Sequence, residues 1–267
     1  MKTYKIAYNK TRPAKLLEQE GIILKMKKII YELVLLTFVI WISVSNINCS
    51  SVHFITGNGK LMTSEKKVSI FEKIKSGGVA EVRFYASEQY HVTVTVDTNL
   101  CEFVEIFTQN NVLNIRAQRG CNYDFTKFLV EVYSPILTGV SISGSGSFVG
   151  TEKIITQSFE ASVSGSGIIE GAIECENFYG KISGSGQINV VGATKDTNII
   201  IAGSGNFNGN SFNAKNATVS VSGSGIANIC VDDNLNAHVS GSGSINYCGK
   251  PAQINSTVSG LGRVKEM

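Results

Sequence analysis

Apolar and polar residues alternate through the C-terminal half of the sequence around a tripeptide that recurs at nearly constant spacing. Gly-Ser-Gly begins at Gly144, Gly165, Gly184, Gly203, Gly223 and Gly241, and Gly-Leu-Gly begins at Gly260. The successive steps are 21, 19, 19, 20, 18 and 19 residues. Flexible low-complexity linkers do not keep such a register, so the pattern indicates a repeated structural unit.

Two apolar columns accompany the tripeptide. Two residues before its first glycine, every repeat has a β-branched apolar residue: Ile142, Val163, Ile182, Ile201, Val221, Val239 and Val258. Four residues after that glycine, every repeat has an apolar residue: Phe148, Ile169, Ile188, Phe207, Ala227, Ile245 and Val264. This alternation predicts β-strands that enter and leave a glycine corner.

The predicted fold is all-β, with a parallel β-helix-like solenoid of about seven rungs over residues 139–267, where a rung is one turn of the solenoid. A repeat of about 19 residues is too short to bury its own apolar side, whereas stacked repeats share a continuous core. Asn189, Asn208, Asn228 and Asn246 stand five residues after the first glycine in four consecutive repeats. We expect their amides to form a structural ladder along the stack; the alternative is a polar strip that binds a ligand.

Residues 50–138 contain few glycines and lose the period, so we expect a β-strand lead-in unit that caps the solenoid. Alternating stretches at 81–85, 91–96, 112–117 and 128–133 predict strands. Asn110-Asn111, between Phe107 and Val112, is a candidate hairpin turn.

Residues 1–49 are predicted to be a signal or leader segment. An apolar run at 29–44 follows Lys25, Lys27 and Lys28, an arrangement typical of secretory signals, and the true start could be Met26. Cys49 closes the segment, and we expect it to be lipidated; the alternatives are plain cleavage nearby or a retained anchor. The protein is therefore expected in the cell envelope, as an outer-membrane lipoprotein held by its lipid anchor or in the periplasm.

Composition and charge narrow the function classes. Of 27 glycines, 21 fall between Gly139 and Gly262, and 17% of residues are charged, which disfavours an ordinary helical enzyme. The net charge of +3 comes from the leader, where 8 Lys/Arg face 3 Asp/Glu; residues 50–267 hold 16 against 18. We therefore expect no nucleic-acid partner.

Catalytic and metal-ligating patterns are not recognisable in the sequence. The three histidines, His53, His91 and His238, have no partners at metal-ligand spacing. Asp232-Asp233 is the only acidic pair in the repeats, and we interpret it as a solvated loop. We expect no catalytic residues, no metal and no cofactor.

The cysteines offer two candidate disulfides. Cys101 and Cys121 flank the predicted hairpin, and Cys230 and Cys248 each lie seven residues after the first glycine of consecutive repeats. In-register neighbours lie near the Cα separation that a disulfide needs, and exported compartments are oxidising. The alternative for Cys230 and Cys248 is two stacked buried thiols. Cys175 has no predicted partner.

The runs VSISGSGSF, KISGSGQINV, VSVSGSGIANI and STVSGLGRVK resemble a bacterial family described as putative auto-transporter adhesin, head GIN domain. The resemblance covers about residues 65–266 and includes the lead-in VTVTVDTNLCEFVEIFTQNNVLNIRA. It implies an exported or lipid-anchored protein of the Bacteroidetes type with a right-handed β-helix-like domain. The family has no defined active site, so no residue roles are carried over. Leu261 departs from the usual serine.

These patterns favour a non-enzymatic, exported envelope protein that is adhesin-like or surface-structural, with a glycan or a surface protein as ligand. The alternative is a carbohydrate-binding or carbohydrate-processing envelope protein, for which Phe178, Tyr179 and Tyr247 are candidate sugar-platform residues. Assembly into homo-oligomers by end-to-end pairing is compatible with both.

Overall fold

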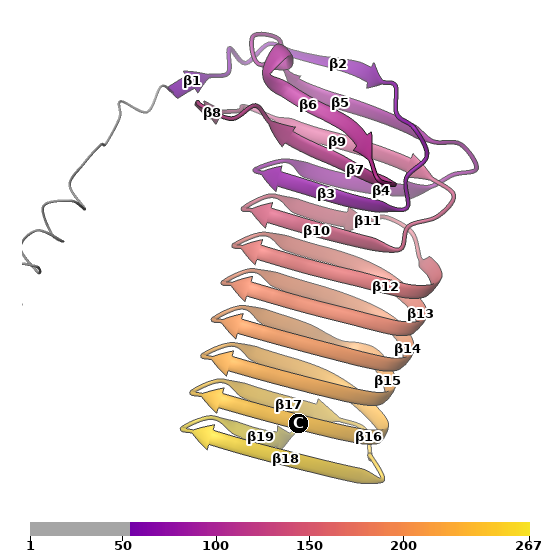
Figure 1. Ribbon diagram of the computed structural model, residues 1–267, viewed down its shortest axis with the longest axis vertical. Helices are drawn as coiled ribbons and strands as arrows, with labels where there is room; N and C mark the ends of the chain where they lie inside the picture. Colours follow the sequence, from indigo (N-terminus) through magenta and orange to yellow (C-terminus); the bar gives the residue numbers. More distant parts are fainter. Residues whose placement is uncertain (1–53) are drawn as a thin grey trace, which may run out of the picture. The chain divides into compact units, whose positions relative to one another are not determined.

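Stacked strands make up most of residues 54–267, the part of the chain that the computed structural model describes (Figure 1). The N-terminal strands are β1 (Phe54–Thr56), β2 (Leu61–Lys66), β3 (Lys73–Gly78), β4 (Glu81–Ala86), β5 (His91–Asp97), β6 (Val104–Gln109), β7 (Val112–Ala117), β8 (Asn122–Asp124) and β9 (Phe128–Ser134), with a 3₁₀ turn, η1, at Cys101–Phe103. The repeats supply β10 (Gly139–Gly144), β11 (Ser147–Gly150), β12 (Ile154–Gly165), β13 (Ile168–Gly184), β14 (Gln187–Gly203), β15 (Asn206–Gly223), β16 (Ile226–Gly241), β17 (Ser244–Cys248), β18 (Gln253–Gly260) and β19 (Arg263–Glu266).

The repeats form the predicted solenoid. Successive rungs pair in parallel, and the first glycine of each tripeptide lies opposite that of the next, from Gly144 and Gly165 through to Gly241 and Gly260. Repeat length varies without disturbing this register, because the extra residues form irregularities away from the corner, for example between Gly209 and Asn213. The prediction of an all-β solenoid is confirmed.

The two apolar columns form the core. Ile142, Val163, Ile182, Ile201, Val221 and Val239 are fully buried, as are Ile169, Ile188, Phe207, Ala227 and Ile245. Phenylalanines fill the space between the columns: the ring of Phe178 lies 6.3 Å from that of Phe159 and 4.9 Å from that of Phe212. Each rung thereby buries apolar area that one repeat alone would leave in water.

The corner explains why both tripeptide glycines are needed. Gly203, for example, has φ of +119°, and a Cβ there would lie 2.6 Å from the carbonyl oxygen of Gly184 in the preceding rung. A Cβ on Gly205 would lie 2.4 Å from Ile182 Cγ2. Between them, the backbone N–H of Ser204 donates to Gly184 O over 2.9 Å. Corner bonding therefore uses the backbone, and the middle side chain is free to vary, so Leu261 is tolerated with 91% of its surface exposed.

The lead-in strands extend the stack in an order that the sequence does not predict. β3 pairs in parallel with both β7 and β10, and β4 pairs in parallel with both β9 and β11. The β3–β4 rung therefore lies between two rungs that follow it in the chain. Its corner is Gly77-Gly78, and Gly78 pairs with Gly144.

Antiparallel strands close the N-terminal end of the stack. β6 pairs with β7 on one side, and β5 pairs with β9 and β2 on the other. Asn110 and Asn111 have φ of 51° and 59° and join β6 to β7, which confirms the predicted hairpin turn. The parallel rungs are thereby covered, and β2 and β6 become the edge strands at this end, each with one strand neighbour among the described residues.

Asparagine ladders run along the outside. Asn208 Nδ2 donates to Asn189 Oδ1 over 2.6 Å, and the series continues through Asn228 to Asn246. A second ladder, which the sequence analysis missed, joins Asp196, Asn216 and Asn234 over 2.8 and 2.7 Å. The amides bond to one another, as expected of a structural ladder.

The leader predictions fall outside the described residues. They concern the apolar run at 29–44, the start at Met26 and lipidation of Cys49. Within residues 54–267, no helix is long and apolar enough to cross a membrane.

Candidate functional site

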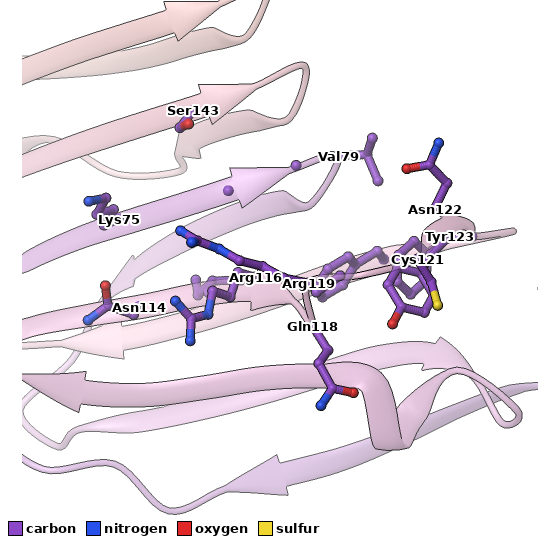
Figure 2. Close-up of a pocket in the computed structure, with 16 residues that line it drawn as sticks. Lys75, Val79, Asn114, Arg116, Gln118, Arg119, Cys121, Asn122, Tyr123 and Ser143 are labelled. Carbon is purple, nitrogen blue, oxygen red and sulfur yellow. The ribbon is translucent and has the colours of Figure 1, made fainter. Parts of the chain in front are cut away.

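A hollow of about 490 Å³ lies near the N-terminal end of the stack (Figure 2). It borders the side chains of Lys75 on β3, Asn114 and Arg116 on β7, and Ser143 on β10. These residues alternate with the buried Ile74, Leu113, Ile115 and Ile142, so they project from the outer face of the layer. The segment 118–128 forms the opposite wall.

Gly77 creates part of this space. It pairs with Ser143, and the same column continues with Ser164, Ser183, Ala202, Ser222, Ser240 and Ser259. The serine of this column is thus replaced by glycine where the hollow lies. A Cβ on Gly77 would meet Arg116 Cβ at 3.7 Å, an ordinary contact, and the backbone is not in the left-handed region. The missing side chain leaves room without being required by the fold.

The lining is basic. Three cations, Lys75, Arg116 and Arg119, border the hollow, and its lining contains no Asp or Glu among the described residues. Arg116 is held in place: its Nε lies 2.6 Å from Glu105 Oε2, and its Cζ lies 5.2 Å from the centroid of the Phe107 ring. Within residues 54–267, Lys75 and Arg119 form no ion pair.

Aromatic rings form one wall. The Tyr123 ring lies 5.8 Å from that of Phe125, which lies 4.8 Å from that of Phe128. Phe103 supports Tyr123 from 5.2 Å. Burial, with smaller contributions from Cys121 and Glu105, raises the pKa of Tyr123 above its ordinary value. Its hydroxyl is therefore neutral at physiological pH.

A buried carboxylate positions this wall. Asp97, at the end of β5, is fully buried and accepts hydrogen bonds from Thr126 N and Gly59 N over 2.9 Å each. Burial alone would raise the pKa of Asp97, but hydrogen bonds from Thr126, Gly59 and Lys127 outweigh it and hold the pKa below its ordinary value. Asp97 thus ties the segment that contains Phe125 and Phe128 to the cap.

Two other hollows lack this chemistry. One, of about 560 Å³, contains Ile155 and Tyr179, but its charges are Lys73 and Glu160, which pair over 2.9 Å. The other, of about 380 Å³, follows the first asparagine ladder. There Asn189 Nδ2 already donates to Glu170 Oε1 over 2.9 Å. The basic, aromatic hollow is the candidate site because two of its three cations, Lys75 and Arg119, have no ion-pair partner among the described residues.

The histidines and acidic residues named from the sequence do not meet. His53 lies outside the described residues. His91 Nδ1 lies 3.1 Å from Glu65 Oε1 at the surface, and His238 is exposed on β16. Asp232 and Asp233 are exposed between the paired residues Val231 and Asn234. No three His, Cys, Asp or Glu side chains in residues 54–267 are grouped as metal ligands would be.

The aromatic residues named as a sugar platform are also separate. Phe178 is fully buried in the core, whereas Tyr179 is half exposed on the same strand. Tyr247 lies on β17, where it pairs with Ile229 and Glu266. Strand alternation directs Phe178 inward and Tyr179 outward, so the three side chains form no common surface.

The cysteine pairs differ. Cys230 and Cys248 pair in register between β16 and β17, with Cα atoms 4.4 Å apart and a disulfide joining them. Cys101 and Cys121 are not bonded to each other; both thiols are free and partly buried. Cys101 belongs to η1 and Cys121 to the segment between β7 and β8, so neither shares a ladder that would fix their spacing. Cys175 is also free, and burial raises the pKa of its thiol.

Sequence reasoning missed the residues of the hollow. Lys75, Arg116, Arg119 and Tyr123 come from segments that meet only because β3 lies between β7 and β10. The one local signal is the corner Gly77-Gly78, where Gly77 occupies the position that is a serine in most of the repeats.

Comparisons with known proteins place the fold among solved structures. A putative adhesin from Bacteroides fragilis is 22% identical, with a TM-score of 0.75, and covers 80% of this chain and 100% of its own. A putative adhesin from Parabacteroides merdae is 28% identical, with a TM-score of 0.66, and covers 81% and 100%. A putative lipid binding protein from Parabacteroides distasonis is 23% identical, with a TM-score of 0.69, and covers 80% and 99%.

No curated protein matches the chain. The family model described as putative auto-transporter adhesin, head GIN domain, matches residues 70–251. This range takes in the glycine corners from Gly77-Gly78 to Gly241 and all of the residues that line the hollow. The chain therefore belongs to the putative auto-transporter adhesin, head GIN domain family.

Proposed function

We propose that the protein is a non-enzymatic, exported envelope protein of the adhesin-like kind, which presents a ligand-binding hollow at the capped end of a solenoid. The observation that supports this most is the constant register of the glycine corners from Gly78 on β3 to Gly260 on β18. Stacked rungs with a continuous core deform little, so groups fixed on the outer face keep their spacing. Family membership supports the same class.

Export and anchoring are part of this proposal. The lysine-flanked apolar run that ends near Cys49 supports secretion, with Cys49 as the lipidated first residue of the mature chain. Mass spectrometry of the N-terminus of the native protein tests both points. A diacylated peptide starting at Cys49 supports the anchor, an unlipidated start nearby leaves export alone, and an intact Met1 or Met26 in the cytoplasm contradicts both.

The adhesin-like role is tested on cells. Cells that display the protein should bind immobilised host or bacterial surface material more strongly than cells with the gene deleted, and surface protease should abolish the difference. Equal adhesion by the two strains, with the protein detected outside the cell, would contradict this role and favour a surface-structural one.

A carbohydrate-binding protein is the second candidate, and the hollow favours binding over processing. Aromatic side chains beside polar groups are typical of small-ligand sites, and the hollow combines Tyr123 and Phe125 with Gln118 and Asn122. Processing by a glycosidase uses two facing carboxylates, and none lines the hollow among the described residues. One related structure is named a lipid binding protein, so lipid is the competing ligand class to test.

A further inference from the structure

We infer that the hollow binds an acidic sugar residue of a glycan, with its carboxylate between Lys75 and Arg119 and its ring against Tyr123 and Phe125. This inference rests on the proposed role as an adhesin-like binding protein and names the ligand class. Four observations support it: two cations without an ion pair, an aromatic wall, polar side chains without a hydrogen bond within the described residues, and a cavity of suitable size. Figure 2 shows Lys75, Arg119 and Tyr123 among the residues that line the cavity.

Two of the cations that border the hollow, Lys75 and Arg119, have no ion-pair partner among the described residues. Three cations border one cavity with no carboxylate in its lining, and only Arg116 has an ion pair, with Glu105. Cations gathered in this way repel one another, and a bound anion relieves the repulsion. Arginine matches the planar geometry of a carboxylate with two parallel donors, and lysine adds a point charge. Arg119, which has no ion pair among the described residues, is the group we assign to the carboxylate together with Lys75.

The neutral side chains suit a ring that carries hydroxyl groups. Within residues 54–267 the side chains of Gln118, Asn122 and Ser143 make no hydrogen bond, whereas Asn114 Nδ2 donates to Val112 O over 3.0 Å. Amides and hydroxyls both donate and accept, as sugar hydroxyls do. Tyr123 and Phe125 present partly exposed rings, against which the apolar C–H face of a sugar can pack.

Size and polarity favour a sugar over a lipid. The volume of about 490 Å³ falls within the range of roughly 300–1,000 Å³ that is usual for small-ligand sites. An acyl chain would need a continuous apolar channel, but Lys75, Asn114, Arg116, Gln118 and Asn122 interrupt the lining with polar groups. The apolar lining comes from the aromatic wall and from Val79, Ile115 and Ala117.

The test uses matched probes and a chain that begins at Ser50, which keeps the compact unit His53–Met267 intact. The probes are sialyllactose against lactose, a glucuronic-acid disaccharide against its glucose counterpart, and vesicles with or without anionic lipid, each at two salt concentrations. We expect binding of an acidic sugar but not of its neutral counterpart, weakened by salt because the attraction between charges is screened.

Variants locate the binding. Lys75→Gln with Arg119→Gln should weaken binding about tenfold or more, since each charge-assisted bond is worth at least that factor. Gly77→Leu should abolish binding by filling the hollow, and Gly77→Ser, the usual residue of its column, shows whether a side chain there is tolerated.

The controls are Lys181→Gln, which lies in the same outward column as Lys75, and Gly171→Leu, where a Cβ meets nothing closer than 3.9 Å. Both should bind as wild type does.

Three outcomes would overturn the inference: equal binding of acidic and neutral probes, wild-type affinity in the double variant, or binding to anionic vesicles without binding to any acidic sugar. If the melting temperature of a variant is well below that of wild type, the comparison of Gly77→Ser with Gly77→Leu takes its place. If cells that display the protein still adhere while no acidic sugar binds, the ligand class is wrong and the adhesin-like role stands. If the variant with both Lys75 and Arg119 replaced loses both acidic-sugar binding and cell adhesion, the two activities use the same site.

Discussion

At the residue scale, the size of a substitution's effect on the free energy of unfolding depends on whether the side chain points into the core or into solvent. Val221 is fully buried in the inner column, and Asp232 and Asp233 are exposed in a stretch where β16 has one residue more than β15. We expect Val221→Asp to lower the free energy of unfolding by about 4 kcal/mol or more, because it buries an unpaired charge. Asp232→Ala should change it by less than about 0.5 kcal/mol.

Urea unfolding followed by circular dichroism measures both changes, with Asp233→Ala as the second exposed variant. A midpoint for Val221→Asp equal to that of wild type would show that the inner column is not the core. A marked loss in either aspartate variant would assign the pair a structural role that its exposure does not predict.

Asp97 gives a prediction for pH. Its folded-state pKa lies below the ordinary value, whereas in the unfolded chain it is about 3.9. The ionised carboxylate therefore adds stability above about pH 4, and this contribution is lost as the pH falls from there through the lower folded-state pKa. Asp97→Asn should cost about 2 kcal/mol at pH 7, since it weakens charge-assisted hydrogen bonds in a buried site.

Unfolding curves at a series of pH values, for wild type and Asp97→Asn, measure this contribution. The two stabilities should converge as the pH falls below about 4. Curves that stay parallel throughout would mean that folding does not shift the pKa of Asp97. Because Asp97 holds the segment of Phe125 and Phe128, sugar binding should weaken in the variant as well.

At the element scale, the glycine corner is the most sensitive part of each rung. Gly203→Ala places a Cβ 2.6 Å from the carbonyl oxygen of Gly184 and forces a side chain onto a residue with φ of +119°. We expect a loss of about 2 kcal/mol or more. Ser204→Ala, one position away, should be nearly neutral, since that side chain is exposed.

The melting temperatures of Gly203→Ala and Ser204→Ala, measured by thermal unfolding, test this prediction. If Ser204→Ala proved as damaging as Gly203→Ala, the serine hydroxyls would contribute to the corner, contrary to the backbone bonding described above. The same comparison at Gly165 and Ser166 should give the same order, because the corner geometry repeats.

How far the elements could be predicted depends on how local their signals are. The apolar columns at Val163 and Ile182 and the glycine register are repeated many times, so the solenoid follows from the sequence. The insertion of β3 between β7 and β10 cannot be predicted from the sequence, because pairings between distant segments leave no local pattern. The hollow depends on that insertion, which brings Lys75 and Ser143 beside the segment of Arg116 to Phe128, and so these residues could not be grouped beforehand. Cys230 and Cys248 could be paired from the sequence, because they occupy the same position in consecutive repeats.

At the scale of the whole molecule, the two ends of the stack differ. The N-terminal end is covered by antiparallel strands, β2, β5 and β6, whereas β18 and β19 at the other end pair in parallel with the rung before them. Val258 continues the inner column yet is 43% exposed, and Ile254 is equally exposed. We expect a second copy to pair with this edge antiparallel, which would set Arg263 opposite Glu266 of the second copy.

Sedimentation velocity over a range of concentrations tests the pairing. Wild type should dimerise as concentration rises, and Val258→Lys should stay monomeric because like charges would face each other across the edge. Gly171→Leu, away from this end, serves as the control. A wild-type protein that is monomeric at its highest soluble concentration would contradict the prediction.

The tolerance of the stack to unequal repeat lengths has a consequence for how such proteins diversify. Each rung contacts only its neighbours, and the corner register survives repeats of 18 to 21 residues. A whole repeat can therefore be duplicated or lost within the stack without redesign of the remainder, and each one alters the length by about 4.8 Å. The distance between the hollow and the far end becomes a heritable variable, adjusted in fixed steps by gene duplication, while the residues of the hollow remain as they are.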